Sequence, residues 1–434
     1  MLPPLLLAVI LMLLPAPLAA PRPPPLAVRS VVQLEGGTRA TSAGRYTNVK
    51  LGRDGLPLVL YNRDRGGIVR AQHCADSACA QRTATNLSAP TSGSAGRFID
   101  LAMAQNGLPL AVWAGPYIHL ALCTTPDCAA SSGGRVLHQA AGAYPSIAIG
   151  DDGRPRVAYY LETGALQLAT CADPLCCANK PSGVCVASTA TLASGPGMGK
   201  YPSLAICSGG RPCAAYQDSY AGHLMFVACA DAACSSVGTP VTIDASGTQL
   251  GTYISMKVGV DGRPVMMYAD ERTGAIKVAA CRSADCGQGA PTISTIDHAG
   301  VGCYGEFPEL DISRLTGFPI LSYFNQTSTT SGGLRITQCG DADCSTAALR
   351  TSQTALTGKC GFGRDTSIAI GHDGSGAPAV FVSFLDYNGG GSAKRASLAV
   401  LGRGAGSASL RGQGAQVRAP PSGKNDICQG VVGE

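Results

Sequence analysis

Apolar and polar residues alternate in short segments that recur along this chain, and residues 144–176 are the clearest copy. Their sequence, YPSIAIGDDGRPRVAYYLETGALQLATCADPLC, contains three apolar runs of strand length, separated by an Asp-Gly turn and a polar loop. Val, Ile, Tyr and Thr are enriched in strands, and Asp-Gly pairs tolerate the positive φ of tight hairpins. The pattern predicts three antiparallel strands followed by two cysteines.

A glycine with a proline two residues later marks each copy of this unit. The seven glycines are Gly55, Gly107, Gly153, Gly210, Gly262, Gly317 and Gly376, at intervals of 52, 46, 57, 52, 55 and 59 residues. Proline cannot donate to a sheet, so it belongs at the start of the strand after the turn. A fourth apolar run follows, as at 240–244 and 291–296, and periods of this length are expected of propeller blades. We therefore predict an all-β, seven-bladed β-propeller with four-stranded antiparallel blades.

Two aromatic positions recur in the unit. The first strand opens on Tyr46, Phe98, Tyr144, Tyr201, Tyr253 and Phe307, and the seventh copy has Asp365 there. The second strand carries Tyr61, Trp113, Tyr159, Tyr216, Tyr268 and Tyr323 four residues after the proline. Because every blade must pack on its neighbours, packing is the favoured interpretation of these aromatics, with ligand binding as the alternative.

The seventh copy ends near residues 396–400 without a fourth strand. Residues 31–34 resemble the missing strand, so we expect an N-terminal strand to complete blade seven and close the ring without an open sheet edge. The predicted organisation is a Pro-rich spacer over 21–27, the propeller over 28–402, and a disordered tail rich in Gly, Ser, Ala and Arg over 403–434.

Residues 1–20 predict a secretory signal peptide, because they hold an apolar run over 5–14 that is too short to span a bilayer comfortably. An uncleaved anchor is the alternative. The cleavage position is open, since Pro21 is unfavourable just after a cleavage site. No other stretch could span a membrane, so we expect a secreted protein, extracellular or periplasmic.

Nineteen cysteines behind a signal peptide indicate an oxidising compartment. Six copies of the unit end in Cys-x4-Cys: Cys74/Cys79, Cys123/Cys128, Cys171/Cys176, Cys229/Cys234, Cys281/Cys286 and Cys339/Cys344. A disulfide across each turn is favoured over a metal site, because motifs on different blades cannot meet to supply four thiolates. Further expected pairs are Cys207/Cys213, Cys177/Cys185 and Cys303/Cys360, which leave Cys428 free or bonded to another molecule. Asn86 and Asn325 begin glycosylation sequons that matter only in a eukaryotic host.

Charge excludes some partners. Only 14% of residues are charged, the net charge is +5, and no basic stripe is present. We therefore expect no nucleic acid and no membrane surface as a partner. A monomer is also expected.

Alternating strand directions place two sets of loops on one face, called here the upper face: those that precede the first strand and those between strands two and three. This face also collects Arg45, Arg97, Arg364 and Glu271. Aromatic rings suit the CH faces of a sugar, and carboxylates accept its hydroxyls. The candidate ligand-binding residues are Tyr46, Asp64, Tyr144, Glu162, Tyr201, Asp218, Tyr253, Asp270, Glu306, Asp365 and Asp386. Solvated loop acids are the simpler interpretation of the carboxylates. No cofactor and no metal are predicted, with calcium held by the loop acids as the alternative.

The repeat resembles that of secreted bacterial propeller proteins, which reads approximately YPSIAIG-DG-P-ISYYD-TNGDLKVA-C-C, over about residues 45–400. Such proteins look related to sialidase-like (BNR-type) propellers. This chain has no Ser-x-Asp-x-Gly-x-Thr-Trp box and no Arg-Ile-Pro near its start, and its single Trp departs from tectonin-type lectins. The resemblance therefore implies the fold and not an activity.

These observations favour a secreted, disulfide-stapled binding module for a glycan or a cell-surface protein. One alternative is a glycoside hydrolase or lyase that uses carboxylates of the upper face, although no catalytic residue can be assigned. Another is a structural surface protein without a small-molecule ligand.

Overall fold

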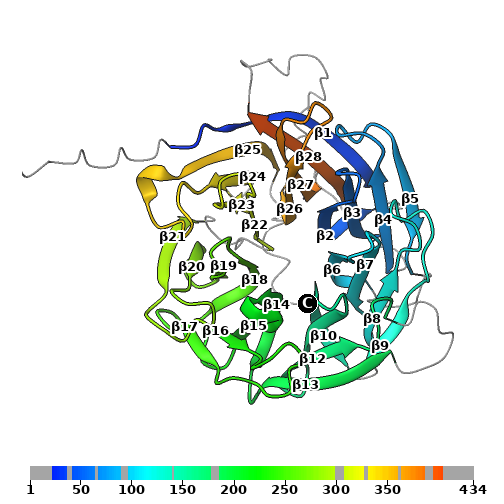
Figure 1. Cartoon of the computed structure of the whole chain (residues 1–434). Helices are drawn as coiled ribbons and strands as arrows, with labels where there is room; N and C mark the ends of the chain where they lie inside the picture. Colours follow the sequence, from blue (N-terminus) through cyan, green and yellow to red (C-terminus); the bar gives the residue numbers. More distant parts are fainter. Residues whose placement is uncertain are drawn as a thin grey trace, which may run out of the picture.

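The computed structural model is a ring of seven four-stranded antiparallel sheets, which confirms the predicted seven-bladed β-propeller (Figure 1). It describes residues 22–36, 42–63, 67–88, 96–138, 141–176, 185–298, 307–326, 331–359, 363–386 and 394–403. Within these ranges the only helical turns are the 3-10 turns Ser208–Gly210 and Ala347–Leu349. No helix in these ranges has the length and apolar character needed to cross a membrane.

The blades follow one another in chain order. Blade one is β2 (Ala43–Leu51), β3 (Pro57–Arg63), β4 (Ile68–Cys74) and β5 (Arg82–Asn86). Blade two is β6 (Arg97–Met103), β7 (Pro109–Ala114), β8 (Ile118–Leu122) and β9 (Arg135–His138). Blade three is β10 (Gly142–Ile149), β11 (Pro155–Leu161), β12 (Ala165–Cys171) and β13 (Val186–Ser194). Blade four is β14 (Met198–Cys207), β15 (Arg211–Asp218), β16 (His223–Ala228) and β17 (Val241–Asp244).

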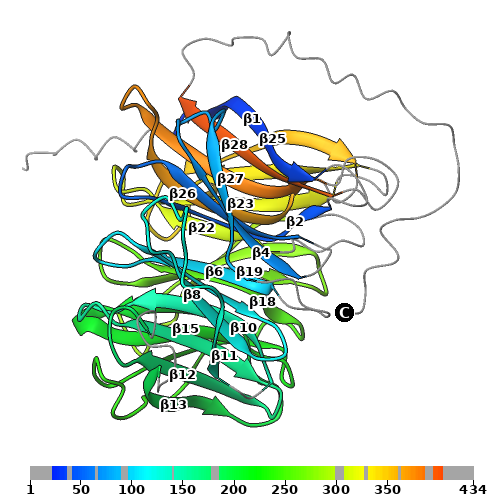
Figure 2. The same cartoon turned by 90° about the vertical axis from the view of Figure 1, so that its right-hand side faces the viewer.

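Three blades complete the ring. Blade five is β18 (Leu250–Val258), β19 (Pro264–Asp270), β20 (Ala275–Ala280) and β21 (Thr292–His298). Blade six is β22 (Glu309–Ile312), β23 (Pro319–Gln326), β24 (Ser331–Gln338) and β25 (Thr351–Lys359). Blade seven is β26 (Arg364–His372), β27 (Pro378–Asp386), β28 (Arg395–Arg403) and β1 (Leu26–Gly36). The first strand of each repeat lies nearest the central axis (Figures 1 and 2).

The repeated glycines and prolines have the roles expected of them. All seven glycines have φ between 72° and 82°, a region that residues with a Cβ rarely adopt. The following strand begins at the proline in six blades and one residue before it in blade four. These turns define the face opposite the upper face, called here the lower face.

The second-strand aromatics pack between blades. Tyr61, Trp113, Tyr159, Tyr216, Tyr268 and Tyr323 are at most 1% exposed. Three of their hydroxyls donate to carboxylates: Tyr61 to Glu35, Tyr268 to Asp244 and Tyr323 to Asp297. The packing interpretation is confirmed for this set, because the buried rings join the cores of neighbouring sheets.

Seven predicted disulfides are present. They are Cys74–Cys79, Cys123–Cys128, Cys171–Cys176, Cys207–Cys213, Cys229–Cys234, Cys281–Cys286 and Cys339–Cys344, with Cα–Cα distances of 4.7–5.9 Å. Cys185 is also disulfide-bonded, and its predicted partner Cys177 lies outside the described residues. Cys303, Cys360 and Cys428 lie outside them as well.

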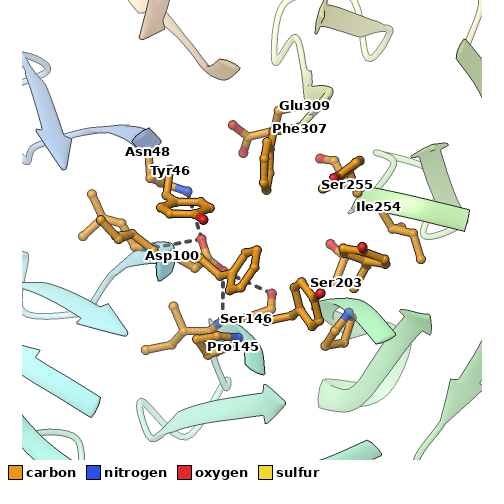
Figure 3. Close-up of a pocket in the computed structure, with 18 of the residues that line it drawn as sticks. Tyr46, Asn48, Asp100, Pro145, Ser146, Ser203, Ile254, Ser255, Phe307 and Glu309 are labelled. Atoms are coloured by element: carbon orange, nitrogen blue, oxygen red, sulfur yellow. Dashed lines mark hydrogen bonds between the residues drawn. The ribbon is translucent and has the colours of Figure 1, made fainter. Parts of the chain in front are cut away.

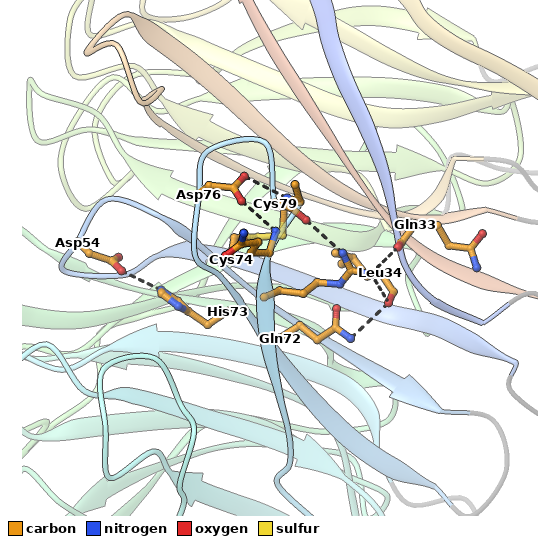
Figure 4. The surroundings of a disulfide bond; sticks show 11 residues. Gln33, Leu34, Asp54, Gln72, His73, Cys74, Asp76 and Cys79 are labelled. Carbon is orange, nitrogen blue, oxygen red and sulfur yellow. Dashed lines mark hydrogen bonds and ion pairs between the residues drawn. A yellow bond between two sulfur atoms is a disulfide. The ribbon is translucent and has the colours of Figure 1, made fainter. Parts of the chain in front are cut away.

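The N-terminal strand closes the ring. β1 pairs antiparallel with β28 from Leu26 opposite Arg403 to Gly36 opposite Arg395, so its first two residues fall within the segment predicted as spacer. The side chains of Gln72 and Arg82 in blade one donate to the carbonyl of Leu34 (Figure 4). β1 therefore belongs to blade seven by pairing and is tied to blade one by side chains.

We predict that the closing strand contributes strongly to stability. Leu34 is 4% exposed and packs in the core between blades seven and one. Leu34→Ala should lower the free energy of unfolding by about 2–5 kcal/mol, because it leaves a cavity. Val31 of the same strand is 45% exposed, and Val31→Ala should change the free energy of unfolding by less than about 0.5 kcal/mol. Thermal unfolding of both variants checks this, and equal midpoints would contradict it.

Candidate ligand site at the channel mouth

One residue at or just before the start of each innermost strand lines the mouth of the channel and has a positive φ. These seven mouth residues are Tyr46, Phe98, Tyr144, Tyr201, Tyr253, Phe307 and Asp365, and all have φ between 49° and 54°. In six blades the pairing register of the innermost strand shifts around this residue, as between Arg45 and Asn48 in blade one. A bulge bends a strand and re-aims a side chain. The recurring first-strand aromatic therefore marks a backbone feature as well as a side chain.

The six aromatic mouth residues form a continuous collar around the channel (Figure 3). Neighbouring ring centroids from Tyr46 round to Phe307 are 4.2–4.9 Å apart. Tyr46 then meets Phe307 edge to face at 5.6 Å, across the position of the seventh blade. Such tilted and edge-on geometries are those that aromatic pairs favour. Six rings thus close a collar over seven blades.

Asp365 is what allows the collar to close. Its carboxylate accepts a hydrogen bond from the Tyr46 backbone N–H at 3.1 Å, and the Thr47 hydroxyl donates to its carbonyl. Asp365 is 5% exposed and carries no ring, which leaves room for Tyr46 and Phe307 to touch. Asp365, which replaces the aromatic residue of the other six copies, therefore links blade seven to blade one.

Beneath the collar, a belt of hydrogen bonds runs from blade to blade. In each bond, the side chain two residues after a mouth residue accepts from a backbone N–H of the next blade. The donors and acceptors are Ile147 to Asp100 (2.9 Å), Leu204 to Ser146 (3.1 Å), Met256 to Ser203 (2.9 Å), Leu310 to Ser255 (3.2 Å), Ile368 to Glu309 (2.9 Å) and Val49 to Ser367 (3.0 Å). Asn48 departs from this rule, because its amide donates to Asp100 at 3.1 Å. The belt satisfies one N–H group on the unpaired inner edge of six of the seven sheets.

Charged groups from distant blades meet inside the channel. Glu309 of blade six lies 3.2 Å from Lys50 of blade one and 3.8 Å from Lys257 of blade five. Burial disfavours the ionised Glu309, but the two ammonium groups outweigh it and lower the pKa of Glu309. Burial likewise opposes charge on Lys50, yet Glu309, Asp100 and Asp311 raise the pKa of Lys50. The sequence analysis did not identify Lys50, Lys257 and Glu309. Each lysine lies four residues after the mouth residue of its blade and Glu309 lies two residues after its own, and this regular spacing could have pointed to them.

The hydroxyls of three collar tyrosines, Tyr46, Tyr144 and Tyr201, stay protonated at neutral pH. Burial, reinforced by Asp365 and partly opposed by Arg45 and Arg97, raises the pKa of Tyr46 to about 12. Burial also raises the pKa of Tyr144 and of Tyr201, whose hydroxyls are hydrogen-bonded to each other. The collar therefore offers apolar ring surface together with neutral groups that can donate and accept hydrogen bonds.

The collar, Asp365 and the belt line a cavity of about 180 Å³. Of the predicted site residues, this cavity brings together Tyr46, Tyr144, Tyr201, Tyr253 and Asp365. Asp64 and Glu306 lie outside the described residues. The other four, Glu162, Asp218, Asp270 and Asp386, line neither this cavity nor the second one described below.

Two of those acids hold their own loops. Asp218 accepts from the backbone N–H groups of Tyr220 and Ala221, and Asp270 accepts from those of Arg272 and Thr273. Such contacts are typical of Asp in turns. Within the described residues, no group of three or more His, Cys, Asp or Glu side chains is placed to hold a metal ion. Calcium binding by the loop acids stays a prediction.

No family model and no curated protein matches this chain. Among solved structures, it is similar to a variant of the NanB sialidase of Streptococcus pneumoniae, with 10% identity, a TM-score of 0.46, and coverage of 86% of this chain and 70% of that one. An ulvan lyase shares 10% identity with a TM-score of 0.49, over 83% of this chain and 95% of that one. An α-L-arabinofuranosidase of Fusarium graminearum shares 12% sequence identity with a TM-score of 0.46, and the match covers 86% of this chain and 97% of that one. Likenesses this distant carry no conclusion about the ligand or chemistry of this chain.

We predict that loss of one belt bond destabilises the ring. Ser203→Ala leaves the Met256 N–H without its acceptor and should lower the free energy of unfolding by about 1–3 kcal/mol. Ser188 is exposed on the outermost strand of blade three, so Ser188→Ala should change the free energy of unfolding by less than about 0.5 kcal/mol. Thermal unfolding midpoints compare the two, and a Ser203→Ala midpoint equal to that of Ser188→Ala would argue against the belt.

A pH-dependent effect is predicted for Asp386. Burial raises the pKa of Asp386 to about 6, although Arg395 at 3.8 Å lowers it in part. The folded protein binds the Asp386 proton more tightly than the unfolded chain does. This contributes stability that is fully present below the unfolded pKa of about 4 and is lost as pH rises through the folded pKa of about 6. Asp386→Asn should therefore unfold at a higher temperature than the wild type at pH 7, with a smaller gain at pH 4. A gain that does not change with pH would refute this origin.

Proposed function

We propose that the protein is a secreted glycan-binding propeller that seats one sugar residue on the aromatic collar. The observation that carries this proposal is the continuous set of six partly exposed aromatic rings, with tyrosine hydroxyls among them, at the upper mouth of the channel. The seven disulfides support an oxidising compartment, as a secreted protein requires.

The chemistry of the collar suits a sugar in two ways. Ring faces pack against the CH face of a pyranose, and the hydroxyls of Tyr144 and Tyr201 can exchange hydrogen bonds with its hydroxyls. The cavity of about 180 Å³ is smaller than the ~300–1,000 Å³ of pockets for drug-sized ligands. Its size therefore supports recognition of one sugar ring, with the rest of a glycan extending toward the loops.

Binding is favoured over catalysis by the state of the carboxylates. Hydrolysis or elimination needs acids free to exchange protons with the substrate. Asp100 and Glu309 are held by the belt, Asp365 by Tyr46, and Asp218 and Asp270 by their own turns. These five carboxylates therefore serve structure, which supports a lectin-like role.

A glycan array followed by calorimetry tests the proposal. Tyr201→Ala should lower the affinity for the tightest-binding glycan about tenfold, because it removes a stacking surface and a hydroxyl. Tyr201→Phe removes the hydroxyl alone and should lower this affinity about threefold. Tyr220 is 84% exposed and lines neither cavity, so Tyr220→Ala is the matched control and should bind as the wild type does.

Three outcomes separate the alternatives. Binding that is equal in all variants would place the glycan outside the collar. Binding lost on addition of a chelator would indicate calcium held by loop acids. An array without any specific binding would refute the proposal in favour of a protein partner or a structural role.

A further inference from the structure

The lower end of the channel opens into a second cavity, of about 920 Å³. It lies where blades six, seven and one meet, and apolar side chains form much of its wall: Leu26, Ile312, Phe318, Ile320, Ile370 and Val380. Lys50 and Asp311, at the lower ends of β2 and β22, line it where it reaches the channel. This volume lies within the ~300–1,000 Å³ usual for organic ligands.

Cationic side chains surround this cavity. Arg22, Arg53, Arg314 and Arg403 line it and are exposed, whereas Asp311 is the one carboxylate among its described lining residues. Burial raises the pKa of Asp311. The cavity therefore has a positive rim over an apolar wall.

The rim arginines differ from other arginines of the lower face. Arg29, Arg156 and Arg263 each pair with a carboxylate of a Gly-x-Pro turn. Among the described residues, Arg53, Arg314 and Arg403 have no carboxylate within ion-pair distance, and Arg22 bonds only the Thr351 hydroxyl. Unneutralised cations beside a cavity leave a positive potential that attracts anions.

We propose that this cavity binds an amphipathic organic anion, with its apolar body between blades six and seven and its acidic head at Arg314 and Arg403. Charge argues against the chain's own C-terminal segment as the occupant. Residues 404–434 contain Arg411, Arg418 and Lys424 against Asp426 and Glu434, a side-chain charge of +1, so the side chains of that segment do not supply the excess negative charge that complements the rim. A separate ligand with a carboxylate, sulfate or sulfonate head is complementary in both charge and polarity.

Fluorescence of anilinonaphthalene sulfonate with the full, folded chain tests the proposal. The dye should bind, and octanoate, decanoate and laurate should displace it with rising affinity, about fourfold per buried CH₂. Dodecanol, which has the same number of carbons as laurate and no charge, should displace it at least tenfold less well. Equal competition by dodecanol would show an apolar site without anion recognition and would overturn the proposal.

Matched variants locate the site. Arg314→Ala combined with Arg403→Ala should weaken laurate about tenfold or more. Arg154→Ala is the control, because Arg154 is exposed on a lower-face turn of blade three and does not line the cavity. Both variants should keep the wild-type melting temperature and wild-type glycan binding. A negative result for anion binding in the lower cavity is therefore distinguishable from a negative result for glycan binding on the collar. No dye binding, or double-variant affinity equal to that of Arg154→Ala, would overturn the proposal.

Discussion

The structure depends on one recurring hydrogen bond, in which a side-chain oxygen of one blade accepts a backbone N–H from the next. The innermost strand of every blade has an edge with no partner strand, and its inward N–H groups need acceptors. Ser146, Ser203, Ser255 and Ser367 supply them with short side chains, and Asp100 and Glu309 do so with carboxylates. Each bond links two blades, so the belt fixes their relative position around the axis.

The bulge next to the belt gives the two ends of the channel different chemistry. In six blades it lies at the mouth residue, at the upper end of the channel, where the aromatic rings touch and narrow the opening. Among the described residues, no such collar lines the lower end. There the channel meets a larger cavity with apolar walls and unpaired arginines. One backbone plan therefore yields an aromatic platform on one face and a cationic cavity on the other.

The repeat could be predicted because its marks are local. The turn glycines need positive φ, and Cys-x4-Cys brings its own Cα atoms into bonding range. The seventh repeat lacks a fourth strand, which indicated a strand supplied by the N-terminal segment. The regular spacing of Lys50, Lys257 and Glu309 from the mouth residues could have marked them as related positions. That their charges meet could not be predicted, since they come from blades one, five and six and approach one another only in the closed ring. The loop acids were ambiguous for another reason. Asp218 and Asp270 look like ligands in sequence, but in the structure they bind the backbone of their own turns.

The most direct measurement of the account is a crystal structure of the protein soaked with the glycan it binds most tightly. The account predicts one sugar ring at the upper mouth, stacked on the collar and within hydrogen-bond distance of a tyrosine hydroxyl. A sugar found only on the outer loops, or in the lower cavity, with the collar empty, would contradict it.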